Sequence, residues 1–177
     1  MTERPLGGYA TLSGAFTLLV AAFGTWFRRS GRQLPERVGL GDLVLLTIAT
    51  HKISRLITKE RVASTLRAPF TRYEAEGGPG EVEERPRGEG LRRAIGELLV
   101  CPYCIALWIA AGFAAGLTVA PRATRLTATV FTAVFGSDVL QIAHRRLEDS
   151  VAEPDAPASR GAPDGRPTRL VEATRIG

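Results

Sequence analysis

The chain has 177 residues, which is enough for one domain, and 45% of them are hydrophobic. It carries 23 basic and 18 acidic residues, and the net charge of +5 suits an anionic membrane surface as well as a nucleic acid. Recognition helices, zinc-finger spacings and aromatic-basic platforms are not found, so nucleic acid is not an expected partner. The apolar residues are gathered in four runs, which indicates an integral membrane protein.

The first run, Tyr9 to Phe27, contains no charged residue. It is longer than the core of a typical signal peptide, and no small-x-small cleavage site precedes Arg28. We therefore predict a retained anchor helix, which forms an amino-terminal segment with its basic loop over residues 1–38.

The second run, Leu40 to Ile57, is weaker. Asp42 lies near its start, and Lys52 and Arg55 lie near its end. It spans a bilayer only if these polar side chains reach the two interfaces. The alternative is a helix that lies at the membrane surface, which would leave three spanning helices.

The third run, Leu98 to Ala120, is uncharged and is closed by Pro121. The fourth, Leu126 to Ala143, is interrupted by Asp138. A helix rises about 1.5 Å per residue and needs about 20 residues to cross a bilayer core. Both runs are therefore predicted to span, or nearly span, the membrane.

The connection over residues 58–94 is the longest. Its first half is basic, with Val62 and Leu66 at helical spacing, and is typical of a segment that lies on lipid headgroups. Its second half, residues 74–90, is rich in Glu and Gly and is predicted to be a mobile, solvated loop. The tail over residues 149–177 has little to bury, and we expect it to be disordered.

These runs predict an all-α fold: an integral membrane helical bundle of four transmembrane helices, or three in the alternative, with a core over residues 39–148. Counting Lys and Arg in the loops places both termini and the central loop in the cytoplasm of a bacterial inner (plasma) membrane. The basic loop from Arg28 to Arg37 is the one local signal against this orientation.

Cys101 and Cys104 are the only cysteines and stand at the start of the third run. In the predicted topology, His51 and His144 lie at the same level of the membrane. Two thiolates and two imidazoles form a tetrahedral zinc ligand set, so zinc is one candidate cofactor. The alternative is that both histidines are polar caps at the interface.

The redox interpretation uses the same cysteine pair. A disulfide between residues this close removes little unfolded-state entropy, so the pair is not a structural staple. A cysteine at a helix amino terminus has its thiolate stabilised by the helix dipole. In this hypothesis Cys101 is the more exposed, attacking thiol and Cys104 resolves the mixed disulfide. The remaining interpretation is that both are small packing side chains.

Asp138 is the acidic residue farthest inside an apolar run. An unpaired charge in hydrocarbon costs at least about 2.5 kcal/mol, so a basic partner is expected. Arg55 and Lys52 are the candidates at the same depth, and Arg55 is the partner that we predict. A small transporter or channel subunit would rest on Asp138 alone.

Two further groups concern partners. Gly112 and Gly116 have the spacing that lets helices approach closely, either within the chain or in a homodimer. Lys59, Arg61 and Arg67 are candidates to hold lipid headgroups. The lipid bilayer is the expected partner, together with a second copy or another membrane protein.

The stretch from His51 to Glu60, followed by Arg67-Ala68-Pro69-Phe70, resembles the first block of an uncharacterised bacterial membrane family, domain of unknown function 1360. The stretch from Gly96 to Cys104, followed by Trp108, is similar to the second block. The resemblance covers roughly Leu40 to Arg146. It implies a small multi-spanning protein without an assigned activity, and some relatives in spore formers carry a sporulation label.

Walker loops, nucleophile-base sets and paired catalytic carboxylates are not apparent in the sequence, which disfavours an enzyme. The expected function is a non-enzymatic inner-membrane component with a Cys-x-x-Cys site at the cytoplasmic interface. The alternatives are a membrane-bound thiol-redox or zinc-sensing protein, and a small transporter or channel subunit.

Overall fold

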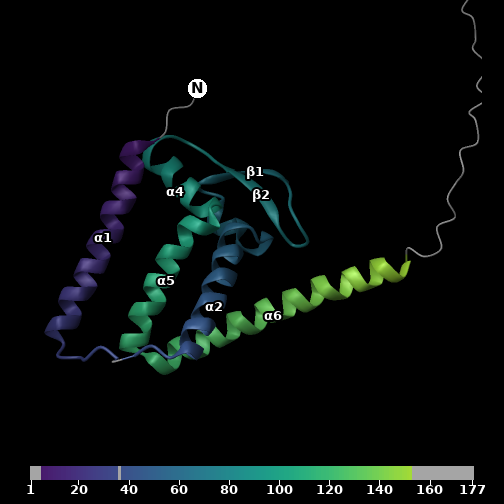
Figure 1. Ribbon diagram of the computed structural model, residues 1–177. Coiled ribbons are helices and arrows are strands. Elements are labelled where there is room, and N and C mark those ends of the chain that lie inside the picture. The colour runs from purple at the N-terminus through teal and green to yellow at the C-terminus, as the bar shows by residue number, and fades with distance from the viewer. Residues whose placement is uncertain (1–4, 36, 153–177) are drawn as a thin grey trace, which may run out of the picture. The chain divides into compact units, whose positions relative to one another are not determined.

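The computed structural model describes residues 5–35 and 37–152 (Figure 1). The described residues divide into two units, the first ending at Leu140 and the second beginning at Gln141. In chain order the elements are α1 (Leu6–Arg29), α2 (Leu40–Thr58), the 3-10 turn η1 (Arg61–Ala63), α3 (Ser64–Arg67), β1 (Thr71–Glu76), β2 (Val82–Pro86), α4 (Gly90–Val100), α5 (Pro102–Val119) and α6 (Pro121–Ala152). The helix α6 passes from the first unit into the second, so residues 149–152 of the predicted tail are helical. The rest of that tail lies outside the described residues.

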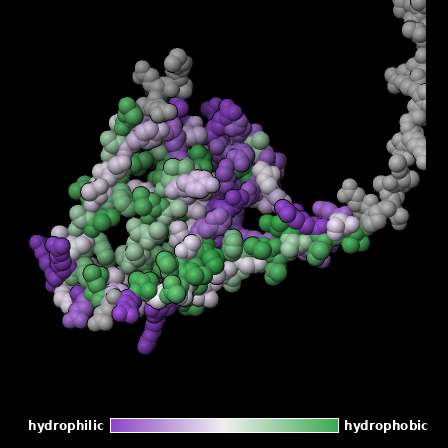
Figure 2. Space-filling model, viewed as in Figure 1, coloured by the Kyte–Doolittle hydropathy of each residue, from purple (hydrophilic) through white to green (hydrophobic). Residues whose placement is uncertain are grey.

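Three helices of the described chain are long and apolar enough to cross a membrane: Leu6–Arg29, Pro102–Val119 and Pro121–Val151. Most of their large side chains face outward, including Leu18, Leu107 and Val130. Figure 2 shows hydrophobic side chains along these helices and hydrophilic ones gathered over the β-hairpin. Extended apolar surface of this kind suits a lipid environment. The predicted helical membrane fold is therefore confirmed, but α2 is not among the three helices and the count of four is not confirmed.

The helix α2 lies beside α5 and the first part of α6. Their small core consists of Ala49, Phe113 and Ala128, surrounded by half-buried aliphatic and aromatic side chains. Near the start of α2, Arg125 donates two hydrogen bonds of 2.8 Å to the Asp42 carboxylate. The small side chains let the helices approach closely, and the ion pair fixes their register.

The predicted loop over residues 74–90 is wrong where β1 and β2 form an antiparallel hairpin, although residues 74–80 are exposed as predicted. Thr71 lies opposite Pro86, and the register shifts between Tyr73 and Ala75. The turn uses Gly80 with φ +77°, a conformation that costs glycine little. A backbone hydrogen bond of 2.9 Å, donated by the Val82 amide to the Lys59 carbonyl, attaches the hairpin to the end of α2. The all-α prediction thus missed a small two-stranded sheet.

The predicted third run is divided between two helices. Leu98 to Val100 end α4, and α5 begins at Pro102. Cys101, between them, is extended with φ −106° and ψ 103°. A residue before proline is pushed out of the α conformation, and a proline tolerates only the first turn of a helix. The chain therefore turns at Cys101 and α5 starts afresh.

The helix α4 is held close to its neighbours by glycines. An added Cβ on Gly96 would lie 2.5 Å from the Phe70 carbonyl oxygen, and one on Gly8 would lie 2.7 Å from the Ala94 side chain. These contacts press α4 against the hairpin on one side and against α1 on the other. They fix the position of the turn that carries Cys101.

Candidate functional site

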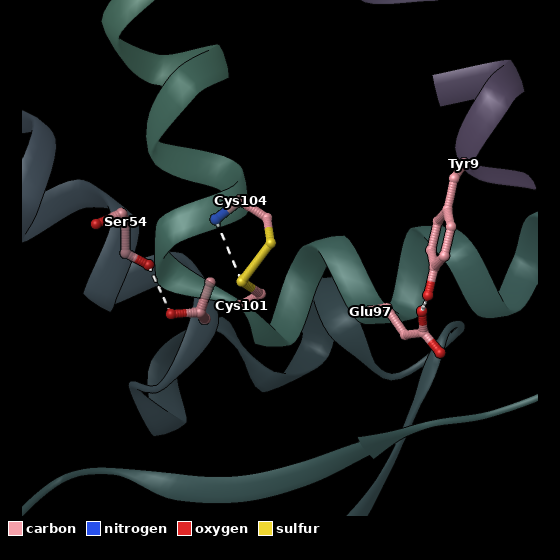
Figure 3. The surroundings of a disulfide bond; sticks show 6 residues. Tyr9, Ser54, Glu97, Cys101 and Cys104 are labelled. Carbon is pink, nitrogen blue, oxygen red and sulfur yellow. Dashed lines mark hydrogen bonds between the residues drawn. A yellow bond between two sulfur atoms is a disulfide. The ribbon is translucent and has the colours of Figure 1, made fainter. Parts of the chain in front are cut away.

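The two cysteines form a disulfide at the amino terminus of α5 (Figure 3). Cys101 is the N-cap residue, Pro102 opens the helix, and the Cα atoms of the two cysteines lie 5.3 Å apart. The Cys104 amide donates a hydrogen bond of 3.2 Å to Cys101 Sγ. Cys101 therefore occupies the position at which a helix stabilises negative charge best.

The exposure of the two sulfur-bearing residues is the reverse of the prediction. Cys101 is half-buried and Cys104 is exposed. Cys101 lies at the turn that directly follows α4, whereas Cys104 lies within the first turn of α5. In Figure 3, Ser54 on α2 lies on one side of the pair, and Tyr9 and Glu97 lie on the other.

A pocket of about 570 Å³ lies between α1, α4 and α5, and both cysteines are in its wall. The remaining lining residues are Tyr9, Leu12, Ser13, Phe16, Thr17, Ala94, Glu97, Leu98, Leu107 and Trp108. The rings of Phe16 and Trp108 meet edge to face with centroids 5.0 Å apart. The pocket is thus apolar and aromatic on much of its surface, with a few hydroxyl groups and one carboxylate.

Glu97 is the carboxylate of this pocket. Tyr9 donates a hydrogen bond to Glu97 Oε2, and Arg93 Nε donates to Oε1 at 3.0 Å. Burial acts to raise the pKa of Glu97, but the hydrogen bonds from Tyr9 and Arg93 outweigh it and hold the pKa below its usual range. Sequence analysis missed this pair because 88 positions separate Tyr9 from Glu97 and no local pattern relates them.

The predicted four-residue zinc set is not assembled in the described part of the chain, where no group of three or more His, Cys, Asp or Glu side chains could hold a metal. His51 is exposed, and its ring meets Phe135 edge to face at 5.5 Å. His144 belongs to the second unit and lies 3.2 Å from Glu148, one turn away.

Asp138 has a basic partner, but it is Lys52 and not Arg55. Lys52 Nζ lies 2.8 Å from Asp138 and also pairs with Glu60, and the Lys52 side chain is 8% exposed. Arg55 pairs instead with Glu81 of the hairpin. Three helical positions turn a side chain by about 300°, so residues 52 and 55 face different neighbours although their depths are similar. The ion pair ties α6 to α2.

The predicted headgroup residues are bound to the hairpin. Lys59 lies 2.7 Å from Glu83, Arg61 pairs with Glu76, and Arg67 lies 2.9 Å from Glu84. Arg67 is fully buried, so the prediction that it holds a lipid headgroup is wrong. The glutamates that indicated a solvated loop instead neutralise the basic segment beside them.

The Arg67–Glu84 pair is the buried centre of this arrangement. Arg67 donates to both Glu84 carboxylate oxygens, to the Ile57 carbonyl at 2.7 Å and to the Glu60 carbonyl at 3.1 Å. Burial acts to raise the pKa of Glu84, but hydrogen bonds from Arg67, Thr71 and Ser64 hold the pKa below its usual range. The Glu-rich stretch beside a Lys- and Arg-rich stretch was the one sequence signal for this pairing.

The two glycines of α5 differ in their surroundings. A Cβ on Gly116 would lie 2.6 Å from Thr124 Oγ1 of α6, whereas a Cβ on Gly112 meets nothing within 4 Å. Gly116 therefore serves packing within the chain, which was one of the two predicted uses.

Comparison with known proteins assigns the chain to a family. A family described as a protein of unknown function, DUF1360, matches residues 45–144, which include most of α2, the hairpin, α4, α5 and most of α6. "Sporulation protein YjcA" of Bacillus subtilis (strain 168) is 31% identical over 86 residues, which cover 47% of this chain and 73% of that protein. No solved structure matches. With more than half of its length matched, the disulfide and hairpin included, this chain belongs to the DUF1360 family of unknown function.

Proposed function

We propose that this chain is a membrane component whose Cys101–Cys104 pair is a reversible thiol–disulfide site. The carrying observation is that a bonded cysteine pair with one exposed member stands at the amino terminus of an apolar helix and lines a pocket. A disulfide that closes so short a loop contributes little to stability. We therefore assign the cysteine pair a chemical role in thiol–disulfide exchange, rather than a structural role as a cross-link.

The geometry favours one order of exchange. An incoming thiolate attacks the exposed Cys104 sulfur, the Cys101–Cys104 bond breaks, and a new disulfide joins Cys104 to the partner. The electron pair of the broken bond stays on the Cys101 sulfur. That sulfur accepts a hydrogen bond from the Cys104 amide at the amino terminus of α5, which stabilises its negative charge. A stabilised leaving thiolate speeds this exchange. A second partner thiolate then attacks the mixed disulfide, which leaves Cys104 reduced and the partner oxidised.

The site is proposed to lie at the cytoplasmic face of a bacterial inner membrane, with α2 as a fourth span and both termini in the cytoplasm. In support, α2 is a 19-residue helix that shares a small core with α5 and α6, and its charged residues Asp42, Lys52 and Arg55 all have partners. Disulfides in the cytoplasm are transient, as catalytic or redox-sensing pairs are. A carboxyl-terminal reporter that is active only in the cytoplasm tests the orientation, and an inactive fusion would reverse it.

Single-cysteine variants test the proposed exchange. With glutathione disulfide, reduced Cys101→Ser is expected to form a mixed disulfide several-fold faster than reduced Cys104→Ser, because the remaining sulfur of Cys101→Ser is the exposed one. Mass spectrometry of acid-quenched samples measures both rates. The same variants unfolded in detergent and urea are the control, and there the two rates should converge.

Two outcomes would count against this proposal. Faster reaction of Cys104→Ser would make Cys101 the entry point and reverse the proposed order. Failure of both folded variants to react, when the unfolded variants do react, would exclude thiol exchange at this site.

A further inference from the structure

Building on the proposed thiol function, we infer that the pocket beside Cys101 and Cys104 binds a lipid-soluble quinone, which reoxidises the reduced cysteine pair.

The place and size of the pocket fit such a ligand. Two of its three walls come from α1 and α5, both long and apolar enough to span a membrane, so a ligand can reach it from the bilayer. Its volume of about 570 Å³ falls within the range of about 300–1,000 Å³ that is usual for small-molecule sites. A quinone ring with the first part of its tail is of this size class.

The lining distinguishes a quinone from other membrane molecules. Phe16 and Trp108 offer aromatic surface to a planar ring, and the Ser13 hydroxyl on the α1 wall can donate to a quinone carbonyl oxygen. The Thr17 hydroxyl donates to the Ser13 carbonyl at 2.9 Å and can accept from a quinol hydroxyl. A plain acyl chain uses none of these polar groups. The carboxylate of Glu97 would repel an anionic headgroup. Because Glu97 is paired with Arg93, the two side chains together carry no net charge that would attract a cationic ligand.

The reaction balances without a further reactant. The reduced pair loses two S–H protons and two electrons as the Cys101–Cys104 bond forms. The quinone gains both electrons and both protons on its two oxygens and leaves as the quinol. The cysteines are in the pocket wall, so the electrons need not travel through the protein.

The test uses the full chain in lipid nanodiscs, reduced, freed of reductant and mixed with ubiquinone-1. One quinol is expected per chain, with disappearance of both free thiols, and none in Cys101→Ser/Cys104→Ser. Ser13→Trp places a large side chain in the pocket and should slow the reaction by about tenfold or more. Leu19→Trp is the matched control, because Leu19 is exposed on the same helix and is not among the pocket residues.

Exchange with glutathione disulfide, measured on the same samples, separates the two proposals. If wild type, Ser13→Trp and Leu19→Trp all exchange with glutathione disulfide, but the quinone leaves their thiols reduced or oxidises Ser13→Trp as fast as wild type, the quinone inference fails and the thiol function stands. If wild type reacts with neither glutathione disulfide nor ubiquinone-1, the proposed thiol function fails together with the quinone inference.

A binding measurement keeps the inference testable if Ser13→Trp does not fold. The chain has two tryptophans, so Trp26→Phe leaves Trp108 alone in the pocket wall. Saturable quenching of Trp108 fluorescence by ubiquinone-1 is expected. Quenching that rises linearly, as partition into lipid alone gives, would overturn the inference.

Discussion

Replacing Glu84 with Gln is expected to lower the free energy of unfolding by about 3 kcal/mol, because removing one partner of a buried ion pair leaves the other charge uncompensated. The Arg67 and Glu84 side chains are 0% and 5% exposed. Glu84 also accepts from Ser64 Oγ at 2.8 Å and from Thr71. In the Gln variant an NH2 group replaces one of the two carboxylate oxygens, so a donor faces the donors of Arg67, Ser64 and Thr71. Detergent-solubilised protein, unfolded with urea and followed by circular dichroism, gives the measurement.

Glu74→Gln is the control for this prediction. Glu74 lies on the same hairpin and pairs with Arg85, whose side chain is 75% exposed. An exposed pair contributes at most about 1 kcal/mol. Limited proteolysis should then cut the hairpin readily in Glu84→Gln and not in Glu74→Gln. Equal stability of the two variants would show that the buried pair does not hold the hairpin.

Replacing Gly96 with Ala is expected to cost about 1–3 kcal/mol and to disturb the cysteine site, because it overpacks the contact between α4 and the hairpin. The added Cβ meets the Phe70 carbonyl oxygen and Pro86, and a backbone oxygen cannot rotate away as a side chain can. Any shift of α4 is passed to Cys101, which directly follows it. Unfolding free energy and the rate of Cys104 exchange with glutathione measure the two effects.

Gly112→Ala is the matched control for Gly96→Ala. The same methyl group at Gly112 meets nothing within 4 Å, and alanine is the better helix former. It should leave stability and exchange rate unchanged or slightly improve stability. If Gly96→Ala behaves like Gly112→Ala, the close approach of α4 to the hairpin is not what positions the cysteines.

The sequence predicted the apolar helices well because hydrophobic runs without charge have few alternatives to burial in lipid. It missed the break at Cys101, since Leu98 to Ala120 is uninterrupted in hydropathy. The signal was nevertheless present: Pro102 favours the first turn of a helix and restricts the residue before it. A boundary at Pro102 would have separated α4 from α5.

The hairpin and the partner of Asp138 depended on contacts between distant residues. A local reading of the Glu-rich stretch favours a solvated loop, and only the basic residues from Arg55 to Arg67 make those glutamates a paired surface. Lys52 and Arg55 both lie at a depth that would allow a pair with Asp138. Their different angular positions around α2 determine that Lys52 is the one that contacts it. The pocket joins α1 to α4 and α5, a proximity that no spacing in the sequence indicates.

The most direct test of the reversible cysteine pair is a redox titration of the full chain in lipid nanodiscs. Samples are equilibrated over ratios of reduced to oxidised dithiothreitol, and free thiols are then labelled with a maleimide polymer that shifts the band on a gel. The proposed function predicts one transition, in which unlabelled protein becomes doubly labelled without a singly labelled species, whereas Cys101→Ser is singly labelled throughout. Two labels at every ratio, or an unlabelled pair that resists full reduction, would contradict it.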